Sequence, residues 1–174
     1  MRLPTLLACP LAALVFVAAL PAVALAQTPP PAAVPAHGVA VADTRVWLIS
    51  LGGTVGDPVL RDGVTSLRIA DESLPWNLTF YGCGPTLCDD IQYSAVFSGP
   101  ITADQINGWN RDNRFLKAYF LPATPGGEAG AVVQYDVVLT STGTGQLREP
   151  TVIWLQMLRT FVQGLAAPEG PPGD

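Results

Sequence analysis

Histidine is nearly absent from this sequence: among 174 residues the only one is His37, in a stretch rich in proline and alanine. The predicted folded part therefore lacks an imidazole for general-base catalysis or for binding a metal. Basic residues are also few, nine Lys and Arg against 14 Asp and Glu, which gives a net charge of −5. Because nucleic-acid binding requires clustered Lys and Arg, this charge excludes a nucleic-acid partner, and it argues equally against attachment to an anionic membrane surface.

Sequence motifs of catalysis are missing as well. The chain contains no Gly-x-Gly-x-x-Gly, Walker A or Gly-x-Ser-x-Gly pattern. The acidic pairs Asp71-Glu72 and Asp89-Asp90 are adjacent in sequence, so in an extended chain the two carboxylates of each pair point apart rather than across a cleft. We therefore predict no catalytic residues, no metal site and no cofactor.

A long apolar run is found only near the N-terminus, from Leu11 to Leu20, where Pro21 ends it. The small-x-small pattern Ala24-Leu25-Ala26 follows and predicts cleavage by signal peptidase after Ala26. A retained membrane anchor would need about 20 uninterrupted apolar residues. We therefore expect residues 1–26 to be a signal peptide. The mature protein is then periplasmic or secreted, with no membrane insertion after cleavage.

The rest of the chain predicts one folded domain between two irregular ends. Residues 27–40 form a Pro- and Ala-rich leader without periodicity, and residues 166–174 form a similar flexible tail. Residues 41–165 alternate helical and strand signals, and they are numerous enough to bury a single hydrophobic core.

The clearest predicted element is a hairpin formed by strands at 76–83 and 88–97. Apolar and polar residues alternate along both strands. Setting Cys83 opposite Cys88 gives one register that joins apolar partners on one face and polar partners on the other, and a shift by one residue spoils both. The predicted pairs are Phe80 with Ile91, Leu78 with Tyr93, Trp76 with Ala95, Thr79 with Gln92, and Asn77 with Ser94.

Two cysteines, Cys83 and Cys88, lie outside the predicted signal peptide. Thioredoxin-like chemistry uses Cys-x-x-Cys with the first thiolate at a helix N-terminus, whereas here four residues intervene and the flanks are strands. A metal site would need further Cys or His ligands. We predict a structural disulfide, which fits both an exported protein and the hairpin register. A redox-active pair is the alternative.

Helices are predicted on either side of these strands. The first runs from Asp43, as N-cap, to Leu51, and the second begins at Thr102, which forms a capping box with Gln105. The last begins near Pro150 and carries an apolar stripe of Trp154, Leu158, Phe161 and Leu165. Further strands are predicted at 54–60, 65–70, 114–120 and 132–139. The order α-β-β-β-β-α-β-β-α predicts an α+β fold, an antiparallel sheet covered by helices in a two-layer sandwich.

Residues 105–115 concentrate Trp, Phe, Asn and Arg where a helix passes into a strand. One interpretation makes Trp109 and Phe115 core residues, with the Asn and Arg side chains capping the helix end, and residue chemistry alone favours it. The other makes the segment a recognition surface, because Trp and Arg are enriched in interface hot spots. The candidate binding surface is then Trp109, Asn110, Arg111, Asn113, Arg114 and Phe115.

This segment resembles the YbjN family of bacterial proteins, described as sensory transduction regulators. The likeness covers about residues 41–165 and includes the helix around Trp154. It rests on an Asn-x-Trp-Asn stretch, then Arg-Phe and Ala-Tyr, and on a Tyr-Gly-Cys hairpin with a second Cys. The matching residues are Asn107, Trp109, Asn110, Arg114, Phe115, Ala118, Tyr119, Tyr81, Gly82, Cys83 and Cys88. The resemblance implies a fold similar to type III secretion chaperones, often homodimeric, and a role in binding or regulation.

These observations support one leading hypothesis and two alternatives. The leading hypothesis is an exported, non-enzymatic binding or regulatory module, chaperone-like in shape, that acts on an extracytoplasmic protein partner. A homodimer is expected because apolar residues cover more than one face of the last helix. The first alternative is a secreted thiol-dependent redox enzyme that uses Cys83 and Cys88. The second is a structural or envelope-stress accessory protein without a discrete ligand.

Overall fold

The computed structural model describes residues 37–70 and 74–166. The predicted signal peptide, residues 27–36 of the predicted leader and residues 167–174 of the predicted tail lie outside the described residues. No helix within the described ranges is long and apolar enough to cross a membrane. In chain order the elements are α1 (Val41–Ser50), β1 (Thr54–Val55), β2 (Val59–Arg61), β3 (Val64–Ala70), β4 (Trp76–Cys83), β5 (Cys88–Ser98), α2 (Ala103–Asp112), β6 (Lys117–Leu121), β7 (Gly130–Val138), the 3-10 helix η1 (Thr144–Leu147) and α3 (Arg148–Ala166).

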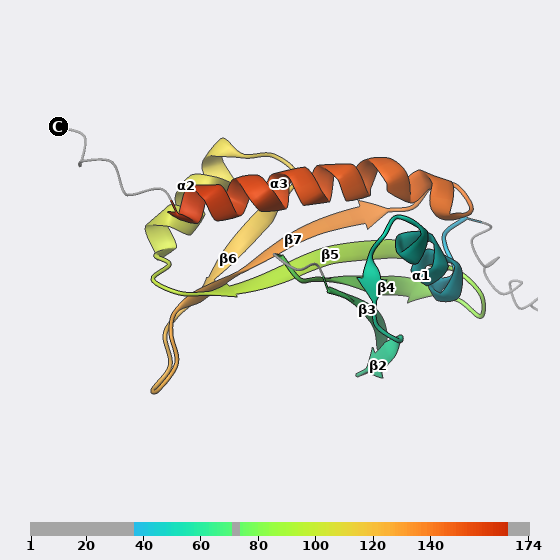
Figure 1. The fold of residues 1–174 in the computed structure, drawn as a ribbon, viewed down its shortest axis with the longest axis horizontal. Helices are drawn as coiled ribbons and strands as arrows, with labels where there is room; N and C mark the ends of the chain where they lie inside the picture. The colour runs from blue at the N-terminus through green and yellow to red at the C-terminus, as the bar shows by residue number, and fades with distance from the viewer. Residues whose placement is uncertain (1–36, 71–73, 167–174) are drawn as a thin grey trace, which may run out of the picture. The chain divides into compact units, whose positions relative to one another are not determined.

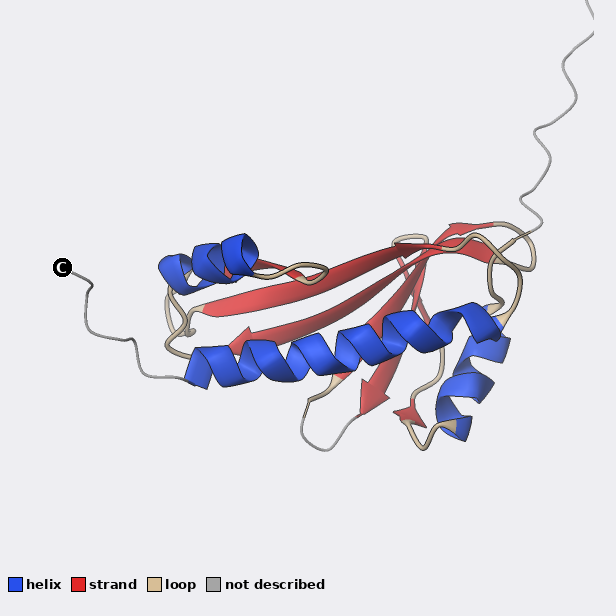
Figure 2. Cartoon of the chain, turned by 90° about the horizontal axis from the view of Figure 1, so that it is seen from above, coloured by secondary structure: helices blue, strands red, loops and turns tan. Residues whose placement is uncertain are grey.

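The described strands form one antiparallel seven-stranded sheet in the order β1-β3-β4-β5-β7-β6, and β2 pairs with β3 beside β1. The long helix α3 runs along the sheet, and α1 lies at one end of it (Figures 1 and 2). The fold is therefore α+β in two layers, as the order of predicted elements indicated. The likeness to type III secretion chaperones rests on the family resemblance alone and stays a prediction.

The helices bury side chains against the same face of the sheet. In α3, the Trp154 ring lies 6.1 Å from that of Trp76 and 5.7 Å from that of Tyr93, between centroids. Phe161 of α3 meets Trp109 of α2 edge to face at 5.0 Å. The predicted stripe on the last helix is thus confirmed for Trp154, Leu158 and Phe161, which are all buried.

The predicted hairpin register is confirmed. The β4–β5 pairing joins Asn77 to Ser94, Leu78 to Tyr93, Thr79 to Gln92, Phe80 to Ile91 and Cys83 to Cys88. Buried and half-exposed residues alternate along both strands. The hydrophobic pattern specifies this register because a one-residue shift would turn every apolar side chain away from the helices.

Several element boundaries differ from those predicted. The strand expected at 54–60 is divided into β1 and β2, because Pro58 has no N–H to donate and interrupts the ladder. The first helix begins at Val41 with Ala40 as its N-cap, so Asp43 lies in the first turn instead. The strand expected from Arg114 begins at Lys117, since Phe115 has a φ of 64°, incompatible with a strand.

The fold also includes residues that precede the predicted domain. Val39 is fully buried and belongs to the hydrophobic core. Its main chain exchanges two hydrogen bonds with that of Cys88, at N···O distances of 3.0 and 2.9 Å. Gly38 joins the main chain of Ser141 and Gly143 in the same way. The short segment before α1 is therefore held at the start of β5, an interior strand, although its composition resembles that of the leader.

Candidate functional site

The predicted candidate surface begins on α2, whose first turn is fixed by the predicted capping box. The main-chain N–H of Gln105 donates to the Thr102 hydroxyl at 3.2 Å, and the Thr102 N–H donates to the Gln105 side chain at 2.9 Å. Ile101 and Ile106, on either side of the box, are both buried. These contacts fix the start of α2 and hence the position of its C-terminal end.

Trp109 packs within the fold. Its ring packs edge to face against Phe161 of α3. Its indole Nε1–H donates to the carbonyl of Leu116 at 3.1 Å, which ties the end of α2 to the residue before β6. Leu116 itself is fully buried. For Trp109 the structure agrees with the core interpretation of the segment.

The two asparagines of the candidate surface hold main-chain groups. The Asn110 side chain donates to the carbonyl of Ala118 at 2.7 Å and accepts from the N–H of the same residue at 2.9 Å. The Asn113 side chain donates to the carbonyl of Trp109 at 3.2 Å, which caps the helix end. Both amides are therefore engaged within the fold and are poorly placed to recognise a partner.

Lys117, which is not among the predicted site residues, binds the C-terminal end of α2. The Lys117 ammonium donates to the carbonyls of Asn110 and Asn113, each at 2.8 Å. A cation is favourable there because the C-terminal end of a helix carries partial negative charge. The sequence signal was available: a basic residue close after a helix C-terminus commonly binds its last carbonyls.

The remaining three residues of the candidate surface are exposed. Arg111 forms a bidentate pair with the neighbouring Asp112, at 2.8 and 3.0 Å. The Arg114 guanidinium lies over the ring of Phe115, 5.4 Å from its centroid. Half of Phe115 is exposed, 50%, and its ring edge meets Tyr135 of β7 at 6.2 Å. The expectation that Phe115 lies in the core is therefore wrong.

An unpaired stretch of strand lies beside Phe115. The β6–β7 pairing covers β7 only as far as Gln134, so residues 135–138 have no β6 partner. The Leu139 N–H donates to Asp89 on the β5 side. Since alternate residues of an antiparallel strand direct their N–H and C=O to opposite sides, Asp136 and Val138 direct theirs away from β5. Within the described residues no main-chain hydrogen bond to them is present on that side.

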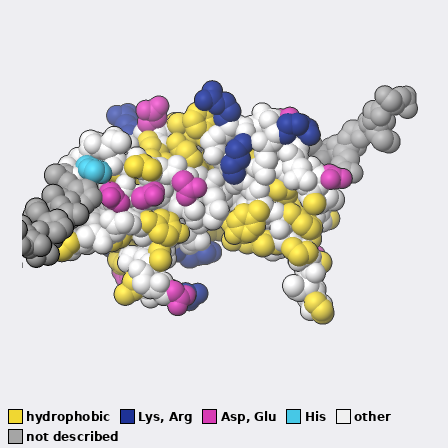
Figure 3. Space-filling view, turned by 180° about the vertical axis from the view of Figure 1, so that it is seen from behind, with side chains coloured by type: hydrophobic (Ala, Val, Ile, Leu, Met, Phe, Trp, Pro, Cys, Tyr) yellow, Lys and Arg dark blue, Asp and Glu magenta, His cyan; other side chains and the backbone are white. Residues whose placement is uncertain are grey.

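We call this region the Phe115 corner, and it consists of Arg114, Phe115, Tyr135, Asp136 and Val138. Val138 is 70% exposed, so the corner combines apolar side chains with an open strand edge. Burial, and then repulsion from Asp136, raises the pKa of nearby Asp90. Acidic and hydrophobic side chains are neighbours on the face shown in Figure 3. Tyr135 and Val138 were not selected from the sequence.

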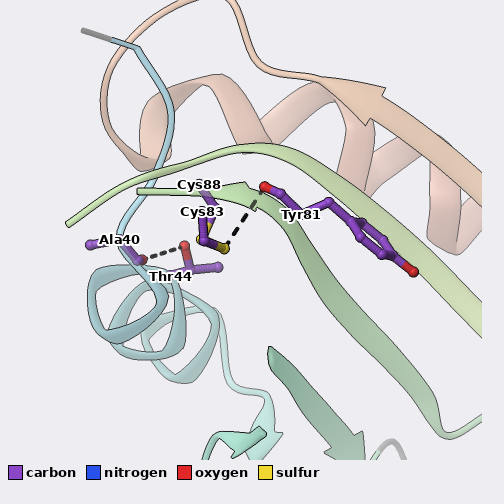
Figure 4. Close-up of a disulfide and its surroundings, with 5 residues drawn as sticks. All are labelled: Ala40, Thr44, Tyr81, Cys83 and Cys88. Carbon is purple, nitrogen blue, oxygen red and sulfur yellow. Dashed lines mark hydrogen bonds between the residues drawn. A yellow bond between two sulfur atoms is a disulfide. The ribbon is translucent and has the colours of Figure 1, made fainter. Parts of the chain in front are cut away.

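The predicted disulfide is present between Cys83 and Cys88 and closes the tip of the β4–β5 hairpin. It lies beside the first turn of α1, and the Cys83 sulfur is 3.8 Å from the carbonyl oxygen of Tyr81 (Figure 4). Cys83 is exposed and Cys88 is buried. No group of three or more His, Cys, Asp or Glu suited to a metal occurs among the residues that the structure describes.

No protein-family model matches this sequence, and comparisons with curated proteins and with solved structures find no match either.

Proposed function

We propose that this protein is an extracytoplasmic, non-enzymatic binding module that holds an extended segment of a protein partner at the Phe115 corner. The observation that carries the proposal is the conformation of Phe115, a half-exposed aromatic residue with a φ of 64°. Positive φ at a bulky residue is a marked outlier, and such outliers concentrate at functional sites.

The local energetics favour a functional explanation of this conformation. The left-handed region costs an L-residue about 1–2 kcal/mol. An exposed aromatic ring also forgoes much of the about 1.5–3 kcal/mol that full burial would contribute. The edge contact with Tyr135 offsets only part of this, because aromatic pairs contribute about 0.5–1.5 kcal/mol. A partner that covers the ring of Phe115 would supply the rest of the burial free energy that the exposed ring lacks.

The open edge of β7 indicates what kind of partner fits. An extended peptide can add a strand to an exposed sheet edge, where main-chain hydrogen bonds supply affinity and side-chain contacts supply specificity. Here Asp136 and Val138 offer the main-chain groups, and Phe115 contacts Tyr135, the first residue of the same unpaired stretch. Arg114 can place a cation–π or ion-pair contact at the rim of the same site.

The compartment is part of the proposal. The predicted signal peptide directs the chain to export, and disulfides such as Cys83–Cys88 persist in oxidising compartments. The resemblance to the YbjN family supports a binding or regulatory role and includes a second copy of this chain among the possible partners. Both the family assignment and the homodimer stay predictions.

Capture from periplasmic extract tests the proposal, with a variant chosen from the structure. Trp109→Ala is unsuitable, because removing a packed indole typically costs about 3–5 kcal/mol and would confuse unfolding with lost binding. The double variant Arg114→Ala/Phe115→Ala removes exposed groups only. Tyr119→Ala is the matched control, since Tyr119 is 48% exposed and pairs with Val132, outside the Phe115 corner.

We expect wild type and Tyr119→Ala to retain the same protein and the double variant to lose it. Identical eluates from all three, or a partner that the double variant also retains, would contradict the proposal. Light scattering of the same samples shows whether the partner is a second copy. A monomer that captures nothing would favour the envelope accessory protein instead.

Thiol–disulfide exchange is a second candidate function, favoured by the exposure of Cys83. Its sulfur is accessible to an attacking thiolate, whereas that of Cys88 is on a buried residue. A standard disulfide-exchange assay distinguishes the candidates. Activity that is lost in Cys83→Ser/Cys88→Ser and kept in the Phe115 corner variant would establish the redox function.

A further inference from the structure

The helices α1 and α3 approach each other at one end of the sheet and then run apart (Figure 2). Residues of both helices line a cleft, and none of them belongs to the Phe115 corner. The volume of the cleft is about 460 Å³, within the range of about 300–1,000 Å³ typical of small-molecule sites. The walls come from α1, β1, β3, β4 and α3, so it is built by long-range packing rather than by one loop. Its main apolar side chains are Leu48, Leu51, Ile69, Trp76 and Leu155.

The lining of this cleft restricts the charge of any ligand. Among residues 37–70 and 74–166, none that lines the cleft is ionisable; the lining residues with polar side-chain groups are Thr54, Thr151 and Trp76, whose indole N–H is a donor. An ionised ligand would lose its hydration without gaining an opposite charge, which is costly in an apolar site. The lining therefore selects a neutral molecule.

A hydroxyl group at the floor supplies a donor without an acceptor. Thr151 is 5% exposed and Tyr93 is fully buried, and their hydroxyl oxygens are 2.8 Å apart. Two hydroxyls hold two hydrogens, and the bond between them uses only one. No other hydrogen bond to either hydroxyl is present in the described part of the chain. The second hydrogen therefore has no acceptor among the described protein groups, and a group bound in the cleft that Thr151 lines can accept it.

We infer that the cleft binds a neutral, mainly apolar small molecule that carries a carbonyl oxygen, which accepts a hydrogen bond from Thr151. In this arrangement Tyr93 donates to Thr151, and Thr151 donates into the cleft that it lines. The apolar part of the ligand packs against Trp76 and the leucine walls. This inference does not depend on the Phe115 corner, which lies outside the lining.

Two neutral fluorescent probes test the inference: 6-propionyl-2-dimethylaminonaphthalene, which has a carbonyl, and 6-propyl-2-dimethylaminonaphthalene, in which a methylene group replaces the carbonyl. Emission titration of the purified mature chain should show saturable, blue-shifted binding of the first probe, about fivefold to tenfold tighter than the second, as one net hydrogen bond predicts. No saturable binding at 100 µM probe (roughly the weakest affinity of a specific fragment of this size) would overturn it.

Four variants assign the binding to the cleft. Thr151→Val keeps the shape but not the hydroxyl, so it should abolish the preference for the carbonyl probe, and Thr151→Ser should keep it. Leu51→Trp narrows the mouth at a residue that is 62% exposed, and should weaken both probes at least tenfold. Val96→Trp, at a residue 61% exposed outside the cleft, should change neither.

The remaining outcomes are equally decisive. An equal loss of both probes in folded Thr151→Val, or unchanged binding in Leu51→Trp, would contradict the inference. If Thr151→Val fails to fold by circular dichroism, the pair Thr151→Ser and Leu51→Trp still decides the case. The Arg114→Ala/Phe115→Ala variant should bind both probes like wild type, which separates this site from the proposed function.

Discussion

The side-chain amide of Asn110 forms two hydrogen bonds with the main chain of Ala118, one as donor and one as acceptor. This is the arrangement that a neighbouring strand would supply, and Ala118 lies on β6, the last strand of the sheet. An exposed strand edge invites pairing with other chains. A single side chain from α2 therefore closes the outer edge of β6 where a further strand would otherwise attach.

Asn110→Ala should lower the free energy of unfolding by about 2 kcal/mol, because two hydrogen bonds of about 1 kcal/mol each are lost. Urea denaturation followed by circular dichroism measures the change, and Asn107→Ala, at an exposed position of the same helix, is the control. In Asn110→Asp the destabilisation should diminish below about pH 4, where the new carboxyl can donate again. Equal stability of Asn110→Ala and wild type would refute the structural role.

The strain at Phe115 can be measured by comparing two substitutions that both remove the ring. Phe115→Gly should be more stable than Phe115→Ala by about 1–2 kcal/mol, because only glycine adopts a φ of 64° without a steric cost. Thermal or urea unfolding of the two variants decides the question. If Phe115→Ala is as stable as Phe115→Gly or more stable, the backbone at this residue is not strained.

Alkaline pH should destabilise the fold through Tyr93. Burial, as the largest cause, raises the pKa of Tyr93 above its ordinary value of 10.0; the bond to Thr151 lowers it and Tyr135 raises it further. The unfolded chain therefore loses this proton first, and the folded state binds more protons above pH 10. The contribution of protonated Tyr93 to the free energy of unfolding is fully present below about pH 10, and it falls as the pH rises beyond that value.

Urea midpoints between pH 8 and 11 measure this slope. Tyr93→Phe should be less stable at pH 8, since Thr151 loses its partner, and its midpoint should depend less on pH above 10. Tyr135 has a pKa raised by partial burial and by Glu149, so a smaller slope persists in that variant. Parallel curves for the two proteins would count against Tyr93 as the main cause.

Loss of the disulfide should be mild and local. The closed loop is short, with a sequence separation of 5, so the chain-entropy contribution is only about 2 kcal/mol. Cys83→Ser/Cys88→Ser should unfold at correspondingly lower urea. Hydrogen exchange should increase first at the amide of Val39, whose acceptor is the Cys88 carbonyl. A uniform increase in hydrogen exchange across the sheet would instead indicate that the whole fold is destabilised.

The parts of the fold that the sequence predicted are those specified by local patterns. Alternation on both faces fixed the pairing of Leu78 with Tyr93, and the capping box fixed the start of α2. The position of β6 at the sheet edge, beyond β7, depends on a crossover that periodicity does not encode. Phe115 was misplaced because an aromatic residue type favours burial, whereas its φ of 64° and its 50% exposure are not encoded in the local pattern.

The residues of the candidate surface also fall into two groups, those that stabilise the fold and those that are exposed. Trp109, Asn110 and Asn113 satisfy the fold, and their roles depend on partners seven, eight and four residues away in sequence. The exposed Arg114 and Phe115 gain their significance from the unpaired end of β7, which begins at Tyr135, far along the chain. Residue type alone could select the segment but could not separate these two groups.

The main-chain pairing of Val39 has a consequence for the order of folding during synthesis. Val39 is among the first residues of the described fold to be made, yet its partner on Cys88 follows much later. The partners of Gly38, Ser141 and Gly143, are synthesised later still. Contacts between residues so distant in sequence form late, because a long loop must close first. Of the described residues, the segment that is synthesised first is therefore among the last to be fixed in place.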